Sequence, residues 1–354
     1  MIIKEKELLR DHTTFQTGGV ASLFIEARTE NDIKEAAIFF KQKNLPVFVL
    51  GGGSNVLVSD NGFKGMVINI LTEGIKSENY EEGRGGENGI VVIAEAGEKW
   101  DSLVGYSVWE GLYGLENMSA IPGTVGGAVA GNIGAYGAEV KDHLLWVDAL
   151  DMRSGSVKRF SNTDCAFIYR NSFFKTEEGK NNIIIRAGFL LSKNGKANIS
   201  YKDLSDFFAL KNSEKVNVAE YVPNLKEIRD AIISIRQSKL PDWEKVGTAG
   251  SFFKNPTVSE KEFSDLKARF PEIPGRIEDS EKRVKLSLGW ILDKICGLKG
   301  MSVGRVGTYG NQALVIVNEG GTASEVLSFA GSIEKIVKEK TGITIEREVE
   351  LVGF

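Results

Sequence analysis

The stretch Ser119-Ala-Ile-Pro-Gly-Thr-Val-Gly-Gly-Ala-Val-Ala-Gly-Asn-Ile-Gly-Ala-Tyr-Gly137 carries most of the information about the fold. Pro122-Gly123 predicts a turn, and Thr124 then stands where it would cap a short helix opened by glycines. The N-terminus of such a helix favours a pyrophosphate through its dipole and its N–H groups. The alternative is a close contact between a helix and a sheet that requires small residues. Tyr136 argues against a purely apolar contact, because it brings a phenol.

The same stretch raises the question of a membrane span. Residues 117–138 carry no charge and contain Gly127-x-x-x-Gly131, a spacing used for helix packing in bilayers. A spanning helix needs about 20 predominantly apolar residues. This stretch contains Pro122 and many glycines, and its large apolar residues are few. We therefore expect no membrane span here.

A second glycine-rich segment, Gly51-Gly-Gly-Ser-Asn55, follows an apolar strand predicted at residues 46–50. It is not a G-x-G-x-x-G fingerprint, because Val56 stands at the third glycine, and no Gly-Lys-Ser/Thr follows to make a Walker A loop. Consecutive N–H groups can nevertheless hold phosphate oxygens, and Ser54 and Asn55 can add donors. A tight turn between two strands explains this motif equally well. The two glycine-rich segments together fit a dinucleotide site of a kind other than the Rossmann fold.

Composition excludes several classes of function. The net charge of −4 comes from 44 basic and 48 acidic residues, which gives no electrostatic reason to expect nucleic acid or an anionic membrane surface as a partner. With only two histidines, a histidine-based metal site or Ser-His-Asp triad is not expected. The two cysteines have no zinc spacing and need no disulfide, which favours a reduced, cytoplasmic setting. Residues 1–10 are charged, so we expect no signal peptide.

Hydrophobic periodicity predicts an α+β protein of mixed short strands and helices. Helices are expected at 30–43, 99–110, 225–239, 286–296 and from 322 to about 340, with a capping box at Ser259–Glu262 opening another. Strands are expected at 21–28, 46–50, 56–58, 66–70, 90–96, 144–151, 156–160, 182–191, 313–318 and 343–352, and a loose hairpin tip at 81–88.

Further motifs follow these segments in a fixed order along the chain. They are Thr14-Phe15-x-x-Gly18-Gly19, Gly51–Asn55, Ile121-Pro-Gly-x-x-Gly126, Asn132-Ile-Gly-Ala-Tyr-Gly137, Tyr169-Arg170-x-Ser172-x-Phe174-Lys175, Lys239-Leu-Pro241, Ala249-Gly-Ser-Phe-Phe-Lys-Asn-Pro256 and Glu346-x-Glu348-Val349. As an ordered set they are highly specific. On these residues the chain resembles the UDP-N-acetylenolpyruvoylglucosamine reductase (MurB) family over nearly its whole length.

The resemblance implies a two-part FAD-binding module of the vanillyl-alcohol-oxidase (PCMH) type with a smaller α+β substrate-binding domain. We accordingly expect FAD-binding subdomains at 1–75 and 76–241, a substrate-binding domain at 242–342, and a C-terminal strand at 343–354 that returns to the active site. It also implies the reduction of UDP-N-acetylenolpyruvoylglucosamine to UDP-N-acetylmuramate by NADPH through FAD, for peptidoglycan precursor synthesis. Hydride would reach C3 of the enolpyruvyl ether and a proton C2. The partners expected are this UDP-sugar and NADPH, bound by a monomer.

The family's catalytic positions match Arg170, Ser251 and Glu348. An arginine can stabilise the enolate charge, a serine can supply the proton, and a carboxyl of raised pKa can share a proton with the substrate carboxylate. The cofactor-binding positions implied are Gly51, Gly52, Gly53, Ser54, Asn55, Ile121, Pro122, Gly123, Gly126, Gly127 and Asn132. The substrate-binding positions implied are Tyr136, Tyr169, Tyr201, Lys239, Asn255 and Gln312. Without the resemblance, each catalytic residue also fits a strand end, a turn or a solvated strand face.

Two positions depart from the family pattern. Glu350 stands where many relatives have an arginine near the flavin, and Gly131 stands where a larger polar residue is common. Another FAD-dependent sugar or alcohol oxidoreductase is the alternative, but such enzymes often tether flavin to a histidine or cysteine, and His12 and His143 lie outside the motifs. A non-catalytic FAD- or nucleotide-sugar-binding protein is a third hypothesis. The joint presence of the three catalytic positions argues against it.

Overall fold

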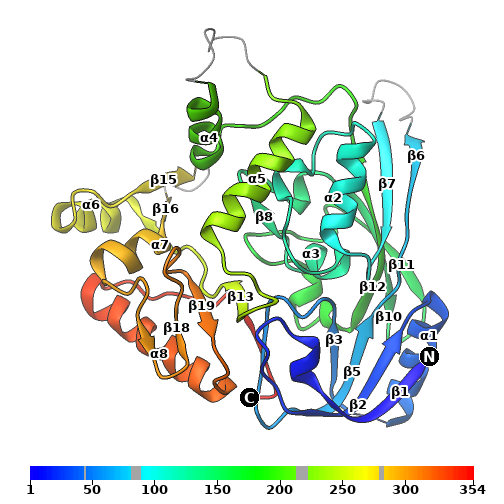
Figure 1. Cartoon of the computed structure of the whole chain (residues 1–354). Coiled ribbons are helices and arrows are strands. Elements are labelled where there is room, and N and C mark those ends of the chain that lie inside the picture. Colours follow the sequence, from blue (N-terminus) through cyan, green and yellow to red (C-terminus); the bar gives the residue numbers. More distant parts are fainter. Residues whose placement is uncertain (44, 81–88, 213–221, 279–282) are drawn as a thin grey trace. The chain divides into compact units, whose positions relative to one another are not determined.

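The computed structural model describes residues 1–354 except 44, 81–88, 213–221 and 279–282 (Figure 1). The hairpin tip expected at 81–88 therefore lies outside the described residues. The chain divides into two compact units. Unit 1 comprises residues 1–7, 21–52 and 64–236, and unit 2 comprises residues 8–20, 53–63 and 237–354.

The first sheet has the strand order β1-β2-β5-β3. Its strands are β1 (Ile2–Leu8), β2 (Val20–Ala27), β3 (Val47–Leu50) and β5 (Phe63–Ile70). Helix α1 (Glu30–Lys43) joins β2 to β3 and has the bounds expected from its sequence. It buries Ile33, Ala36 and Ala37, as its helical spacing predicts, in one cluster with Ile25 and Ile68.

A five-stranded sheet in the order β11-β10-β12-β7-β6 forms the rest of the framework of unit 1. Its strands are β6 (Ile75–Tyr80), β7 (Gly89–Glu95), β10 (Leu144–Asp151), β11 (Val157–Ser161) and β12 (Asn182–Leu191), and all pair antiparallel. Helices α2 (Trp100–Trp109) and α3 (Val125–Ala130) contribute to its core. Trp100 anchors α2, because its buried ring meets Phe189 edge-to-face at 5.8 Å and its Nε1 donates to the Met118 carbonyl at 3.0 Å.

Unit 1 also contains helices α4 (Lys202–Asn212) and α5 (Leu225–Lys239), the latter running to the unit boundary. They share a small apolar cluster in which Leu204, Ile228 and Ile232 are fully buried. Helix α5 ends at Lys239, two residues before Pro241, as predicted. Helix α4 was not expected from the sequence. The short hairpin β8 (Gly134–Ala135) and β9 (Ala138–Glu139) follows α3.

Unit 2 contains a sheet in the order β13-β19-β18-β17, a three-stranded sheet β14-β16-β15, and the pair β20-β4. The strands are β4 (Val56–Val58), β13 (Gly247–Ser251), β14 (Thr257–Ser259), β15 (Gly275–Glu278), β16 (Arg283–Leu286), β17 (Ser302–Val303), β18 (Val306–Thr308), β19 (Val315–Asn318) and β20 (Glu350–Val352). The helices are α6 (Glu260–Arg269), α7 (Leu288–Trp290), which continues as a π-helical turn over Ile291–Ile295, and α8 (Ala323–Thr341).

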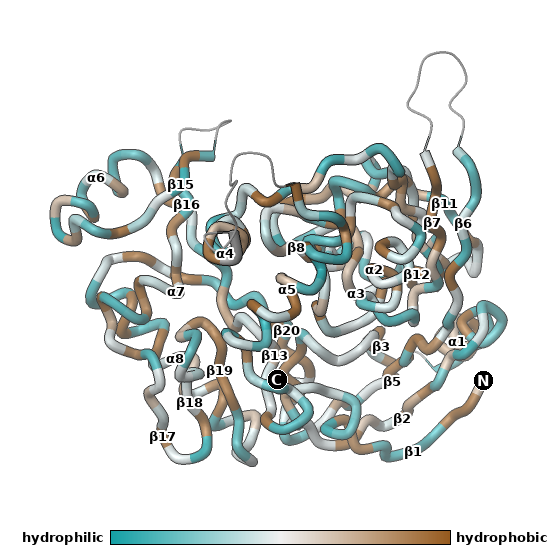
Figure 2. Tube along the Cα trace, turned by 45° about the horizontal axis from the view of Figure 1, so that its top comes forward, coloured by the Kyte–Doolittle hydropathy of each residue, from teal (hydrophilic) through white to brown (hydrophobic). Residues whose placement is uncertain are grey.

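The helix ends of unit 2 follow their sequence signals. Ser259 forms a capping box with Glu262, and Thr322 forms one at the start of α8. Gly342 ends α8 with a left-handed φ of 81°. Only Leu266 of α6 is buried, and this helix is drawn largely in hydrophilic colours (Figure 2).

Two expectations about the C-terminal region need correction. The helix expected at 286–296 begins at Leu288 and is π-helical over most of its length. The strand expected at 343–352 is a strand only over Glu350–Val352, where it pairs in parallel with β4. Residues 343–349 make only scattered main-chain bonds, such as the isolated bridge between Arg347 and Phe253.

The pairing of β20 with β4 also explains why the first 75 residues are divided between the two units. It ties residues 53–63 to the C-terminal end of the chain, and they belong with unit 2 for that reason. The subdomain boundaries expected from the resemblance stay a prediction. No helix in the described part of the chain is both long enough and apolar enough to cross a bilayer.

Candidate active site

The two glycine-rich segments meet within unit 1. A Cβ atom built on Gly51 would lie 2.5 Å from the Thr124 hydroxyl oxygen, and one on Gly52 would lie 2.8 Å from the Cα of Gly123. Neither position has room for a side chain, since real Cβ atoms do not approach other atoms this closely. The structure thus brings together two segments that lie far apart in the sequence, as a shared site requires.

The place where these two segments meet offers a group suited to a phosphate. The hydroxyl of Thr124 is buried and has no hydrogen-bond partner among the described residues. A buried hydroxyl without a partner is costly, so this one is suited to an oxygen of a bound ligand. Thr124 occupies the N-cap position of α3, but its side chain makes no capping bond.

The helix N-terminus itself is less available than the sequence predicts. The N–H groups of Val125 and Gly126 donate to the carbonyls of Glu98 and Ala96 at 2.9 and 2.8 Å. A Cβ on Gly126 would lie 3.1 Å from that of Ala96, so this glycine serves the close helix–sheet contact that the sequence left open as the alternative. The nearby Ile121 packs against the apolar core. These first helical N–H groups are therefore already paired, and contacts of Gly51 and Gly52 with a pyrophosphate stay a prediction.

Arg170 is held by the Asn132–Gly137 segment. Its guanidinium donates to the Gly134 carbonyl at 2.8 Å and to the Asn132 carbonyl at 3.5 Å, and lies 5.0 Å from the centre of the Tyr169 ring. Asn132 is fully buried, and its amide donates to the Glu139 carboxylate and the Ile168 carbonyl. Its side chain therefore supports the segment that orients Arg170, and a cofactor contact by its backbone stays a prediction.

Strained backbone gathers in these same segments. Left-handed φ angles occur at Ala120 (57°), Asn132 (42°), Tyr136 (48°) and Arg170 (56°), although none of these residues is glycine. Such conformations persist only where the surrounding structure holds them, and they cluster at functional sites. Lys6 and Ala166 of the same unit are also left-handed, so the strain is consistent with a ligand site at 120–136 and Arg170 but does not by itself define one.

Two tyrosines of unit 1 form a pair. The rings of Tyr136 and Tyr201 meet edge-to-face with centroids 5.3 Å apart. Burial raises the pKa of the Tyr136 phenol, and the neighbouring Arg236 guanidinium opposes that shift. Tyr201 is exposed, with 44% of its surface open. The structure thus places side by side two residues that the sequence singled out for the substrate.

Unit 2 brings together three of its own expected site residues. Ser251 ends β13 at a bulge that follows Gly250, whose φ is 70°. The next residue, Phe252, is fully buried and accepts a hydrogen bond from the Glu348 N–H at 2.9 Å. The Asn55 amide donates to the Glu348 carbonyl at 3.2 Å. Ser251, Glu348 and Asn55 therefore belong to neighbouring main-chain segments.

The same network fixes what surrounds Glu348. Gly53 turns the chain beside His12, and its φ of 63° favours glycine. Glu350 is exposed, and its N–H donates to the Asn55 carbonyl at 3.0 Å. Arg347 makes a two-bond ion pair with Glu334 of α8, at 2.6 and 3.0 Å, so it points away from Glu348. Arg347 therefore does not replace the arginine expected where Glu350 stands.

The remaining predicted substrate residues of unit 2 have local roles. The Asn255 side-chain oxygen accepts from the Leu288 N–H at 3.0 Å at the start of α7, and that of Gln312 accepts from the Leu314 N–H at 3.3 Å. Lys239 is the last residue of α5. Their contacts with substrate stay predictions, as do those of Ser54, Pro122 and Gly127 with FAD.

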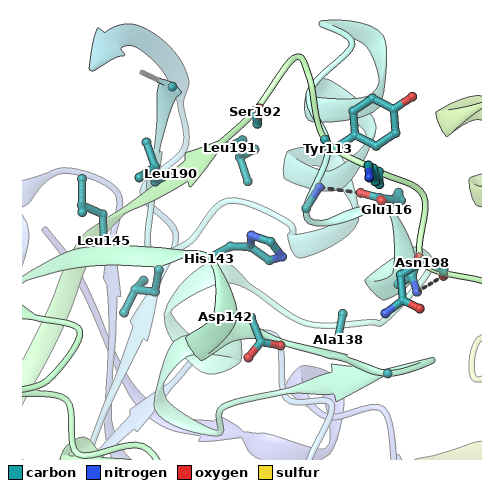
Figure 3. A pocket seen from close by; sticks show the side chains of 17 residues that line it. Tyr113, Glu116, Ala138, Asp142, His143, Leu145, Leu190, Leu191, Ser192 and Asn198 are labelled. Atoms are coloured by element: carbon teal, nitrogen blue, oxygen red, sulfur yellow. Dashed lines mark hydrogen bonds between the residues drawn. The ribbon is translucent and has the colours of Figure 1, made fainter. Parts of the chain in front are cut away.

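A cavity of about 540 Å³ lies in unit 1, among residues that were not predicted to bind cofactor or substrate (Figure 3). Its wall includes the buried Glu116, whose pKa is raised by burial, and His143, whose pKa is lowered by burial. None of the predicted catalytic residues lines it. It lies beside the chain at Gly137 and Asn198, close in sequence to Tyr136 and Tyr201.

Comparison with known proteins gives the family. Residues 21–161 match an FAD binding domain, and residues 241–352 match the UDP-N-acetylenolpyruvoylglucosamine reductase C-terminal domain. A UDP-N-acetylenolpyruvoylglucosamine reductase of Flavobacterium johnsoniae is 38% identical, covering 99% of this chain and 100% of its own length. One from Pseudomonas aeruginosa is 37% identical over 99% of this chain and 98% of its own. The solved structure of UDP-N-acetylenolpyruvylglucosamine reductase (MurB) from Thermus caldophilus aligns with 99% of this chain and 100% of its own at a TM-score of 0.66 and 24% identity.

Proposed function

The chain belongs to the UDP-N-acetylenolpyruvoylglucosamine reductase family, and from that premise we propose how its residues perform the reaction. It is an FAD-dependent oxidoreductase that uses NADPH to reduce UDP-N-acetylenolpyruvoylglucosamine to UDP-N-acetylmuramate, a step of peptidoglycan precursor synthesis. The observation that carries this conclusion is the likeness to its relatives over 99% of the chain. We propose that the protein works in the cytoplasm as a monomer.

The residues of unit 1 fit FAD. Gly51 and Gly52 let the two glycine-rich segments pack together without side chains, and the buried hydroxyl of Thr124 would be a donor for an oxygen of the pyrophosphate. When bound, FAD supplies the hydride transfer that links NADPH to C3 of the enolpyruvyl ether. The fixed backbone of the segment keeps these groups in place before the cofactor arrives.

Arg170 stabilises the charge that develops on the substrate carboxylate. Addition of hydride at C3 places enolate charge on C2 and on the neighbouring carboxylate, and a guanidinium matches a carboxylate with two parallel hydrogen bonds. The bonds from Arg170 to Gly134 and Asn132 fix the direction of its guanidinium, so little reorganisation is needed as charge develops.

Ser251 donates the proton to C2. An alcohol is a weak acid in water, but an enolate carbon is a strong base, so a positioned hydroxyl can serve. The bulge at Gly250 and the buried Phe252 fix the backbone on both sides of Ser251. Glu348 shares a proton with the substrate carboxylate and so helps to hold the intermediate.

Aromatic and polar residues bind the nucleotide end of the substrate. Tyr136, Tyr169 and Tyr201 offer aromatic surface and hydroxyls, and Lys239 offers a charge for the diphosphate. Asn255 and Gln312 complete this set of substrate-binding residues.

Anaerobic single-turnover spectroscopy tests the function. The purified protein should be yellow, lose its flavin absorbance when NADPH is added, and regain it when the enolpyruvyl substrate is added without oxygen. Recovery only with oxygen would indicate an oxidase on the same fold. Protein without flavin absorbance, and unable to take up added FAD, would contradict both functions.

A further inference from the structure

Asn117 joins the two chain segments that carry the tyrosine pair. It lies in the 3-10 turn η2 (Glu116–Met118), and only 2% of its surface is exposed. Its side-chain amide donates to the Tyr136 carbonyl at 2.8 Å and to the Asn198 carbonyl at 2.8 Å. One buried side chain thus holds main-chain atoms that lie 19 and 81 residues away along the sequence.

The segment that leads to Tyr201 lies near the surface, and Gly195 within it packs closely on Tyr113. No side chain between residues 193 and 201 is buried. The cavity described above lies on one side of it, with Asn117, Gly137 and Asn198 in its wall. Partial packing of Ala197 and Ile199 against the cluster of α4 and α5 is its main apolar contact. The bond from Asn117 to the Asn198 carbonyl is therefore one of the contacts that fix this segment, and it comes from a buried side chain.

The other end of the connection is a strained residue. Tyr136 has a φ of 48°, a conformation that a residue with a side chain keeps only when its surroundings hold it. The bond from Asn117 to the Tyr136 carbonyl is one such restraint. Placing Asn117 here is energetically unfavourable in one respect, because its side-chain oxygen is buried and has no hydrogen-bond partner among the described residues.

We propose that Asn117 is a positioning residue that sets Tyr201 against Tyr136 for binding of the UDP-sugar substrate. The inference rests on the function proposed above and adds a residue that no motif marks. The chemistry requires an amide: it has two N–H donors for two carbonyls, whereas a carboxylate has none and a serine has one. Because Asn117 acts on binding groups and not on reacting atoms, its loss should change KM rather than kcat.

The test is steady-state kinetics combined with a double-mutant cycle. Asn117→Ala should raise KM for the enolpyruvyl substrate roughly tenfold, the scale of one or two net hydrogen bonds, and leave kcat within about twofold. Asn117→Ser, which keeps one donor, should give an intermediate KM. In a Tyr201→Ala background the same change at Asn117 should raise KM much less, because only Tyr136 then remains to be positioned.

Asn318 provides the matched control. It is 2% exposed, and its amide also donates to two main-chain carbonyls, those of Phe15 and Gly321, but in unit 2. Asn318→Ala should lower the melting temperature without the rise in KM.

Three results would overturn the role of Asn117. One is an unchanged KM in Asn117→Ala, or in Asn117→Ser if the alanine variant does not fold. Another is a KM rise of equal size in the Tyr201→Ala background, and the third is an equal rise in the Asn318→Ala control. Wild-type protein that does not turn over the substrate would instead refute the proposed function itself.

Discussion

The two units hold their site residues by different means. In unit 1, backbone meets backbone: Gly52 lies so close to Gly123 that a methyl group would not fit, and Arg170 is directed by carbonyls of a strained segment. In unit 2, main-chain hydrogen bonds join the segment that carries Ser251, at the end of β13, to the segment that carries Glu348, just before β20. The arrangement in unit 1 requires glycines where the two segments touch. The arrangement in unit 2 is made by main-chain atoms, so it depends less on which side chains those segments carry.

This difference predicts how each unit responds to mutation. In unit 1 a single added methyl should disturb both the fold and the cofactor. In unit 2, replacing the side chain of Ser251 should cause a large loss of chemistry and little loss of stability.

The largest effect is expected for Ser251→Ala. General acid catalysis is typically worth about 10²–10⁴-fold, so reoxidation of the flavin by substrate should slow by that factor. Reduction by NADPH should keep its rate, and the melting temperature should hardly change, because the bonds around Ser251 are made by the main chain. Stopped-flow measurement of the two half-reactions separates these effects. Equal slowing of both would assign Ser251 a structural role.

Gly52→Ala should have the next largest effect. The new Cβ would lie 2.8 Å from Gly123 Cα, and backbone cannot move aside as a flexible side chain can. Overpacking typically costs about 1–3 kcal/mol, so FAD affinity should fall roughly tenfold to a hundredfold. Titration of apoprotein with FAD, followed by flavin fluorescence, measures the change.

Gly105→Ala is the control for this prediction. Gly105 lies inside α2 of the same unit, and a Cβ there would meet only Arg229, at an ordinary 3.6 Å. Alanine in a helix interior is favoured over glycine by about 0.5–1 kcal/mol, so this variant should be slightly more stable and bind FAD normally. Similar FAD binding by the two variants would show that the approach of Gly52 to Gly123 is not needed for the cofactor.

A substitution at Asp101 tests how firmly unit 1 holds the main chain of Ala120, the residue before Ile121. Its carboxylate accepts from the Ala120 N–H at 2.6 Å and pairs with Arg229 through two bonds of 2.7 Å, while Arg236 donates to the Ala120 carbonyl at 3.2 Å. Burial alone would raise the pKa of Asp101, but the Arg229 guanidinium and the Ala120 N–H outweigh it and hold the pKa below 3.8.

A carboxyl with a depressed pKa stabilises the folded state at neutral pH and loses this contribution as pH falls through 3.8 toward its folded value. Asp101→Asn should therefore lower the free energy of unfolding at pH 7, and the difference from wild type should shrink between about pH 5 and pH 3. Urea unfolding at several pH values measures it. A difference independent of pH would mean that the charge of Asp101 does not matter.

The sequence predicted elements well where their signals are local. The bounds of α1, α5, β10 and β12 are those expected, because apolar spacing and a following proline or turn define them within the segment itself. Helix α4 was missed although Leu204, Phe207 and Phe208 have the spacing of a helix face, and the structure packs that face in one cluster with α5. The C-terminal strand is shorter than expected because only Glu350–Val352 finds a partner, in β4.

In the candidate site too, the sequence predicts residues that belong to local motifs but not the contacts between distant segments. Motif order named Ser251, Glu348 and Asn55, yet no pattern could show that the Asn55 amide reaches the Glu348 carbonyl 293 residues away. Asn117 and Asp101 belong to no motif that the sequence analysis used. They act by holding main-chain atoms of other segments, and only the fold brings those atoms to them.

The smallest effect is expected for Arg347→Ala in unit 2. Arg347 lies between Glu346 and Glu348, and successive side chains of an extended chain point to opposite sides. Its ion pair with Glu334 on α8 is partly exposed, with 29% and 30% of the two side chains open, and such pairs contribute about 0.2–1 kcal/mol. The variant should be slightly less stable and keep its flavin spectrum and both half-reaction rates. A shifted spectrum or a slower half-reaction would mean that Arg347 influences the flavin although it pairs with Glu334 of α8. Residues of unit 2 that contribute to stability would then also contribute to chemistry, unlike the separation predicted for Ser251→Ala.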